Sequence, residues 1–395
     1  MSVTGTERVI VFDTTLRDGE QAAGVFFSRD AKVEIADKLD AMGVDIIEAG
    51  FPTSSPGEFA SVVAVAEHVR GARVCALSRA IAEEVDVTWS AIRAARAPRI
   101  HVFLSSSEIH LAHQLRRGED QVVAMSRAAV ERAVRHTDDV EFSCMDATRS
   151  DPEFVARVVQ VAIAAGATTI NLPDTVGCAR PDQVVEMFRG VFARVPELAS
   201  VVASFHGQDD LGMATANSLA AVAAGARQVE LAVNGLGERA GNTPFEEVLM
   251  ALRLHGPDLG VATGVDTRGI WAVSQAVARH SGIAVPPNKA IVGGNAFRHA
   301  SGIHQDGVLK HRATYEAIDP AEIGHPTGTE IVLGKLSGRH GFAARAQALG
   351  IAFDAEALDR AFARFQAFAD AGGTVDDRGV RALFAEPDVS VESAA

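Results

Sequence analysis

The sequence predicts an α/β fold: a (β/α)8 TIM barrel followed by a smaller, mainly helical C-terminal region. Eight short apolar runs of strand length alternate with amphipathic segments over residues 1–258. Eight such units in roughly 250 residues are typical of a (β/α)8 barrel. A doubly wound open sheet is the alternative, and it is less favoured because no G-x-G-x-x-G follows the first apolar run.

The expected strands are rich in Val, Ile and Phe and are each five to seven residues long. They cover residues 8–12, 45–50, 73–77, 99–104, 139–144, 168–173, 201–206 and 227–233. Helical patterns such as "RDAKVEIADKLDAMG" and "PEFVARVVQVAIAAG" lie between them. Both patterns end in glycine, which is a common residue at helix C-termini.

The pattern changes after the eighth unit. We expect a catalytic barrel over residues 1–258 and a C-terminal linker and helical subdomain over residues 259–395. The stretch that begins "HSGIAVPPNKAIVGG" is rich in Gly, His and Pro and indicates loops. Helical patterns return at 340–350 and 354–371.

Composition excludes several classes of protein. Hydrophobic residues make up 47% of the 395, yet no apolar run is long enough to span a membrane, and no signal peptide is evident. The cysteines, Cys75, Cys144 and Cys178, are odd in number and show no C-x-x-C spacing, which favours reduced thiols in a cytoplasmic protein. The net charge of −14 argues against nucleic-acid binding.

Chemically capable side chains follow the expected strands. Arg17 and Asp18 follow the first strand, Asp146 follows the fifth, and His206 ends the seventh. Because active sites of such barrels lie at the C-terminal ends of the strands, these residues are expected to converge on one rim. The Arg17–Asp18 pair alone would be read as a surface ion pair.

The segment "HGQDDLG" suggests a metal site at the end of the seventh strand. His206 and Gln208 are two residues apart, so they face the same side of a strand. A glutamine is an unexpected partner, since it offers only a neutral amide oxygen where a second histidine would bind a metal more strongly.

Several motifs in this order make the chain resemble the 2-isopropylmalate synthase and homocitrate synthase family. They are "DTTLRDGEQ", "EAGFPTSSPGEF", "DATRSDPEFV", "TTINLPDTVG", "DLGMATANSLAAVAAGARQVE", "NGLGERAGN", "GIHQDGVLK" and "LGKLSGRHGF". The resemblance implies a TIM-barrel acyltransferase that joins acetyl-CoA to a 2-oxo acid by Claisen condensation. It also implies a homodimer in which the C-terminal region reaches a partner's active site, and a divergent member without the leucine regulatory domain.

The resemblance also assigns roles to individual residues. Asp18, His206 and Asn242 match metal ligands, and Arg17 matches the residue that polarises the oxo acid. Positions that line the oxo-acid pocket are matched by Gln21, His101, Ser143 and Thr175. A catalytic pair donated by the partner subunit is matched by His304 and Tyr315, the only tyrosine in the chain.

Two positions depart from the family pattern. Gln208 stands where the family has a second metal-binding histidine, which shifts the ligand set towards oxygen and favours Mg²⁺ or Mn²⁺ over Zn²⁺. Met145 stands in the pocket where the family has a glutamate, and a thioether cannot take up a proton. The catalytic base is then expected to be Asp146, or His304 supported by Tyr315.

These departures leave three interpretations open. The first is an active enzyme for an unusual 2-oxo acid, such as phosphonopyruvate or an aryl pyruvate. The second is an ordinary 2-isopropylmalate or homocitrate synthase that tolerates both changes. The third is a catalytically inactive relative with a binding role, which the survival of most site residues disfavours.

Overall fold

The computed structural model describes residues 6–373 and 375–385. It divides into two compact units. The first comprises Met1–Val285 and Ala290–Val292, and the second comprises Pro286–Lys289 and Gly293–Ala395.

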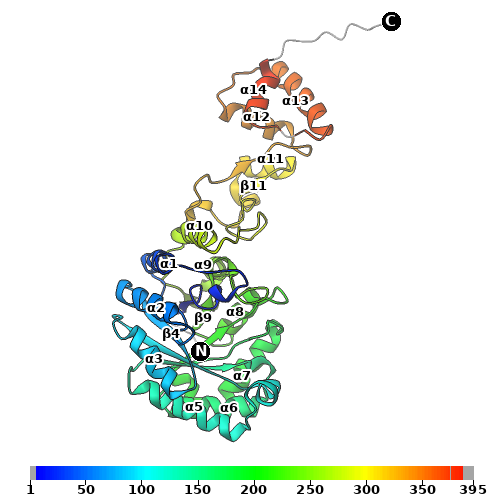
Figure 1. Cartoon of the computed structure of the whole chain (residues 1–395). Helices are drawn as coiled ribbons and strands as arrows, with labels where there is room; N and C mark the ends of the chain where they lie inside the picture. Colours follow the sequence, from blue (N-terminus) through cyan, green and yellow to red (C-terminus); the bar gives the residue numbers. More distant parts are fainter. Residues whose placement is uncertain (1–5, 374, 386–395) are drawn as a thin grey trace. The chain divides into compact units, whose positions relative to one another are not determined.

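The first unit contains a closed barrel of eight parallel strands, as the sequence predicted. Around the barrel the order is β2-β3-β4-β5-β6-β7-β8-β9, and β9 pairs with β2. Figure 1 shows the helices that surround these strands. The strands are β2 (Ile10–Asp13), β3 (Ile46–Glu48), β4 (Arg73–Arg79), β5 (Pro98–Ser105), β6 (Val140–Met145), β7 (Thr169–Asn171), β8 (Val202–His206) and β9 (Gln228–Leu231). Every expected strand is therefore confirmed, with its ends moved by a few residues.

Helices cover the outside of the barrel. They are α1 (Arg29–Ala41), α2 (Pro56–His68), α3 (Ala82–Ile92), α5 (Glu119–Val134), α6 (Pro152–Ala164), α7 (Pro181–Arg194), α8 (Ala214–Ala223) and α9 (Phe245–Leu259), with a short α4 (Glu108–His110). Their starts follow from local chemistry: the Ser55 hydroxyl accepts from the backbone N–H of Glu58, and proline occupies the first helical position of α2.

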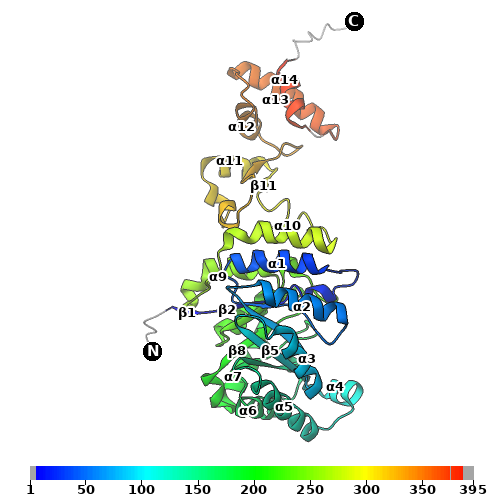
Figure 2. The same ribbon diagram turned by 60° about the vertical axis from the view of Figure 1, so that its left-hand side comes forward.

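The first unit extends beyond the boundary expected at residue 258. Strand β10 (Val261–Ala262) pairs in parallel with β1 (Glu7–Arg8). Helix α10 (Ile270–Ser281), which was not expected, packs beside α1, as Figure 2 shows. Six of its residues are buried, so this segment belongs to the barrel unit rather than to a linker.

The base of the barrel is filled by a buried polar network. Nη1 of Arg99 lies 2.9 Å from Oε2 of Glu141 and 2.8 Å from Oε1 of Gln228. The Gln228 amide also donates to Glu141, at 2.9 Å, and to Ser204, at 3.0 Å. These groups satisfy one another's hydrogen bonds in the interior of the lower barrel.

The second unit is mainly helical. It contains β11 (Arg298–His299), α11 (Gly302–Lys310), β12 (Glu330–Ile331), α12 (Arg339–Ala348), α13 (Ala355–Asp370) and α14 (Asp377–Ala385). Helices α12 and α13 match the expected helical stretches, whereas α11 was expected to be loop. Phe342 and Phe365 stack at 5.0 Å between ring centroids in its apolar core.

Among the described residues, no helix is both long and apolar enough to cross a membrane.

Candidate active site

The strand C-termini enclose a cavity of about 230 Å³ in the barrel mouth. Residues from all eight strands or the loops after them contribute to it. The lining consists of Arg17, Asp18, Gln21, Phe51, Leu77, His101, Phe103, Ser143, Met145, Asn171, Pro173, Thr175, His206, Gln208, Glu230, Glu238 and Arg239. Of the site residues predicted on the barrel, only Asp146 and Asn242 are outside this lining.

The four predicted metal ligands form one cluster. Nε2 of Gln208 lies 2.8 Å from Oδ1 of Asn242, 3.3 Å from Oδ2 of Asp18 and 3.3 Å from Nε2 of His206. Nε2 of His206 is 3.5 Å from Oδ2 of Asp18. All four side chains are buried.

Neighbouring groups orient the cluster. Nδ1 of His206 lies 2.8 Å from Oε2 of Glu230, which leaves Nε2 directed at Asp18 and Gln208. The Asn242 amide donates to the carbonyl of Leu236 at 2.9 Å, so its oxygen is the atom that faces the cluster. Fixing a histidine through its second nitrogen in this way is usual at metal sites.

The cluster fits a divalent cation. It combines one carboxylate, one imidazole and two carboxamides, and oxygen atoms dominate that set. Oε1 of Gln208 is buried without a hydrogen-bond partner among the described residues, so it is free to serve as a ligand. Two other buried groupings, Glu48–Cys75–His101 and His101–Glu141–Glu230, contain possible ligands. Their carboxylates already have partners, since Glu48 bonds to His101 and Glu141 accepts from Arg99.

Charges around the cluster are balanced locally. Burial lowers the pKa of His206, but the hydrogen bond and charge of Glu230 and the charge of Asp18 raise it above its ordinary value. Burial raises the pKa of Glu230, but the hydrogen bond and charge of His206 outweigh it and leave the pKa lowered. The Glu230 carboxylate is therefore charged at neutral pH and is a poor proton acceptor.

Arg17 is held between two carboxylates. Its Nε lies 2.6 Å from Oε2 of Glu48, and its Nη1 lies 3.1 Å from Oδ2 of Asp18. A guanidinium has five N–H donors, so others remain for an anion in the cavity. Burial raises the pKa of Glu48, but the charge of Arg17 and the hydrogen bond from His101 bring it below its ordinary value.

His101 and Ser143 form the polar floor of the cavity with Asn171, which sequence reasoning missed. Nε2 of His101 lies 2.7 Å from Oγ of Ser143, and the Asn171 amide donates to the same oxygen at 2.9 Å. Nδ1 of His101 is 2.8 Å from Oε1 of Glu48. Burial lowers the pKa of His101, but the charges of Glu141 and Glu48 and the Glu48 hydrogen bond raise it above its ordinary value.

An apolar wall stands above this floor. Phe103 and Met145 follow His101 and Ser143 by two residues on β5 and β6, so they face the same interior. Phe51, Leu77 and Pro173 complete the wall. It faces the cluster across the barrel, because β4, β5 and β6 lie opposite β8, β9 and β2.

Asp146 is not part of the cavity lining, although it bonds to Thr175, which is. The backbone N–H of Asp146 donates to Oγ1 of Thr175 at 2.9 Å. The Asp146 carboxylate takes a bidentate ion pair from Arg149, with Nη2 at 2.7 Å from Oδ2, and Nδ1 of His110 is 3.6 Å away. Asp146 has a left-handed backbone conformation, with φ of +68°, in the turn that carries this pair.

His304 and Tyr315 come together within the second unit. Their rings stack with centroids 4.1 Å apart and planes inclined by 29°. Gly307 makes room for this arrangement, since a Cβ there would lie 2.6 Å from the Tyr315 ring. Both rings are exposed.

Sequence reasoning also missed Glu230 and Arg239. Glu230 is a charged residue inside the apolar run "RQVELAV", and that mismatch was the signal that could have revealed it. Arg239 lines the cavity, binds Asp210 at 2.8 Å and donates to the carbonyl of Thr175 at 2.8 Å.

Comparisons with known proteins show which family the chain is similar to. Residues 8–277 match the "HMGL-like" family, and residues 291–373 match the "Homocitrate synthase post-HMGL domain-like" family. A 2-isopropylmalate synthase of Syntrophus aciditrophicus is 48% identical over 98% of this chain and 75% of its own length. One from Pyrococcus furiosus is 48% identical over 96% of this chain and 76% of its own.

The chain belongs to the family of these 2-isopropylmalate synthases. It is an enzyme, an acyltransferase that converts an acyl group into an alkyl group on transfer, and its membership supports condensation of acetyl-CoA with a 2-oxo acid. The unusual oxo acid expected from the sequence gains no support from the relatives' names.

Solved structures share the barrel fold. Hydroxymethylglutaryl-CoA lyase from Pseudomonas aeruginosa superimposes with a TM-score of 0.61 at 23% identity, covering 71% of this chain and 95% of its own. The HMG-CoA lyase from Brucella melitensis gives 0.59 at 24% identity, covering 70% and 99%.

Proposed function

We propose that the enzyme condenses acetyl-CoA with a 2-oxo acid that has an apolar side chain, giving a 2-substituted malate and CoA. This proposal rests on what lies on the two sides of the cavity. Arg17 and the Asp18–His206 cluster lie on one side, and the apolar wall around Met145 lies on the other. The polar side suits an oxo-acid head, and the wall suits a hydrocarbon tail.

The apolar wall narrows the choice of 2-oxo acid. The first candidate is 2-oxoisovalerate, which with an acetyl group makes the product named in the relatives. An aryl pyruvate is the larger candidate, since Phe51 and Phe103 offer aromatic contacts. Phosphonopyruvate fits less well, because its charged phosphonate would face Leu77, Phe103 and Met145 without a partner.

Chain residues orient the oxo acid. Arg17, held by Glu48 and Asp18, presents its remaining N–H groups to the carboxylate or carbonyl oxygen. Ser143 accepts from the Asn171 amide and lies 2.7 Å from Nε2 of His101, so its hydroxyl is held in place on the cavity floor. A divalent cation held by Asp18, His206, Asn242 and Gln208 would polarise the carbonyl and stabilise the alkoxide.

The oxygen-rich ligands favour Mg²⁺ or Mn²⁺ over Zn²⁺. Three of the four side chains offer oxygen, and none is a thiolate. The expected result is that a chelated enzyme recovers more activity with Mn²⁺ or Mg²⁺ than with Zn²⁺; a tight stoichiometric zinc in the purified protein would contradict this.

The proton of the acetyl methyl group needs a base, and three residues in or beside the cavity are unsuited to that role. Asp146 is bound by Arg149, Glu230 by His206, and Met145 cannot accept a proton. We assign the base to His304, oriented by its stack on Tyr315. The pair is supplied by a second copy of the chain, which makes a homodimer the working form.

Bond changes then follow in two steps. The methyl carbon loses its proton to the base, attacks the oxo carbon and forms a tertiary alkoxide, which is protonated. Water then adds to the thioester carbonyl, the C–S bond breaks, and CoA leaves as its thiol.

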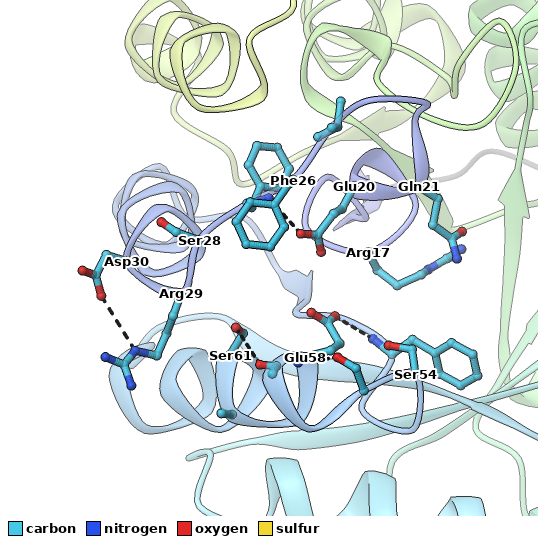
Figure 3. A pocket seen from close by; sticks show the side chains of 16 residues that line it. Arg17, Glu20, Gln21, Phe26, Ser28, Arg29, Asp30, Ser54, Glu58 and Ser61 are labelled. Carbon is cyan, nitrogen blue, oxygen red and sulfur yellow. Dashed lines mark hydrogen bonds and ion pairs between the residues drawn. The ribbon is translucent and has the colours of Figure 1, made fainter.

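Acetyl-CoA requires a path to the cavity, and a second cavity of about 770 Å³ adjoins it. The two share Arg17, Gln21 and Phe51. Figure 3 shows Arg17 and Gln21 at one end and Arg29 at the other, with Phe26 between them. Phe26 is 77% exposed, and we infer that it contacts the pantetheine arm or adenine of CoA.

The direct test measures CoA release with a panel of 2-oxo acids. The proposal predicts the highest kcat/KM for an acid with an apolar branched or aromatic side chain. A clear preference for 2-oxoglutarate or phosphonopyruvate would overturn it.

A further inference from the structure

The amide nitrogen of Gln208 contacts one atom of each of the other three predicted metal ligands. It lies 2.8 Å from Oδ1 of Asn242 and 3.3 Å from both Oδ2 of Asp18 and Nε2 of His206. The side chain is only 5% exposed, so water does not readily replace these contacts.

When His206 is neutral, the three atoms around that nitrogen all present lone pairs. Asn242 uses its amide N–H groups on Leu236, which turns its oxygen inward. His206 is bonded to Glu230 through Nδ1, which turns Nε2 inward. Three buried acceptors facing one point are costly unless a donor or a cation lies between them.

The amide N–H groups of Gln208 serve as the donor for these acceptors, but the amide oxygen of Gln208 is left without a partner. Its Oε1 is buried and has no hydrogen-bond partner within the described parts of the chain. Turning the amide about its last bond would exchange the two atoms. The oxygen would then join three other acceptors, and a cation between them would make that arrangement favourable.

We propose that the Gln208 carboxamide exchanges places with the divalent cation. Without the ion its NH₂ group bridges Asp18, His206 and Asn242; with the ion its oxygen becomes a ligand beside theirs. This inference rests on the proposed metal site and assigns to Gln208 a control of ion affinity that a simple ligand would not have.

Two consequences follow. The ion-free cluster keeps its hydrogen bonds, so removing the ion does not leave three buried acceptors without a donor. Ion binding must break those bonds, so Gln208 weakens affinity relative to a side chain that offers only oxygen.

The test compares wild type, Gln208→Glu and Gln208→Met for thermal unfolding and Mn²⁺ affinity at pH 8. Glutamate keeps the shape but offers no N–H donor. We expect the ion-free Gln208→Glu protein to unfold at a lower temperature than wild type, saturating Mn²⁺ to restore it, and the Mn²⁺ Kd to fall at least tenfold. Gln208→Met, which offers neither a donor nor an oxygen, should lower the unfolding temperature and weaken Mn²⁺ binding.

Gln305→Glu is the matched control. Gln305 is also buried, donates to four oxygens in the second unit and leaves its Oε1 without a partner there. Its variant should lose stability that Mn²⁺ does not restore.

An ion-free Gln208→Glu protein as stable as wild type, with unchanged Mn²⁺ affinity, would overturn the exchange. Failure of wild type to bind Mn²⁺ or Mg²⁺ would also overturn it. In that case CoA release without added metal would still support the proposed condensation, so the two failures are distinguishable.

Discussion

Oε2 of Glu230 lies 2.8 Å from Nδ1 of His206, beneath the cluster that is suited to a cation. Both side chains are buried, and the other carboxylate oxygen of Glu230 has no partner among the residues described. The carboxylate therefore sets the tautomer and the direction of the imidazole, and it supplies negative charge to the metal site.

Glu230→Gln should weaken metal binding without dismantling the site. The amide oxygen can still accept from Nδ1, but the negative charge is lost. We expect Mn²⁺ affinity to fall by roughly 10- to 100-fold, as is usual when such a partner is changed. Titration calorimetry checks this, and an unchanged Kd would show that Glu230 does not act through His206.

Arg17→Met should destabilise the fold as well as abolish catalysis. It leaves the buried Glu48 carboxylate without its nearest cation, which costs roughly 3 kcal/mol. The folded-state pKa of Glu48 lies below its ordinary value of 4.5, so this stabilisation is complete above that pH and is lost as the pH falls through the folded-state pKa.

The difference in unfolding free energy between wild type and Arg17→Met should therefore be constant near neutral pH and shrink below pH 4.5. Denaturant unfolding at several pH values measures it. A difference that grows on acidification would contradict the ion pair.

Met145→Glu should reduce activity towards an apolar oxo acid, whereas Met145→Leu should change kcat/KM by less than about threefold. A carboxylate in the wall would lie near the anionic substrate. Two like charges about 4 Å apart at an effective dielectric of 20 repel by roughly 4 kcal/mol. Steady-state kinetics of both variants would decide, and improved turnover in Met145→Glu would contradict the apolar wall.

Phe26→Ala should raise the KM for acetyl-CoA several-fold and leave the KM for the oxo acid unchanged. Phe26 borders only the larger of the two adjoining cavities. Phe368→Ala is a suitable control, since that ring is half-exposed on α13 in the second unit. Equal effects on both substrates would argue against a role confined to CoA.

His304→Ala and Arg17→Ala subunits, each inactive alone, should regain activity when mixed. Complementation is expected because one subunit would supply an intact barrel and the other an intact His304–Tyr315 pair. The mixture must be shown to exchange subunits by mass spectrometry. Absence of recovery in exchanged heterodimers would place both groups in one chain.

The sequence predicted the barrel because its signal is local. Each strand is a short apolar run, and each helix has a period of 3.6 residues, so residues such as His206 could be placed at a strand end in advance. Helix α10 escaped notice because it follows the eighth unit and packs on α1, which is distant in sequence.

The sequence predicted which residue types make up the site, but it did not predict which of these residues bond to one another. That Asp146 binds Arg149 depends on a turn with positive φ, and no pattern revealed that turn. Glu230 and Asn171 act through hydrogen bonds between different strands, and such bonds become visible only when the barrel closes.

The most direct measurement is kcat/KM for CoA release, with 2-oxoisovalerate, 2-oxoglutarate and aryl pyruvates, in wild type and in the Gln208→His/Met145→Glu double variant. We predict that wild type turns over an acid with an apolar side chain and that the double variant is slower on it. A wild type inert on every acid, beside a double variant that turns over 2-oxoisovalerate or 2-oxoglutarate, would contradict an active enzyme and identify an inactive relative.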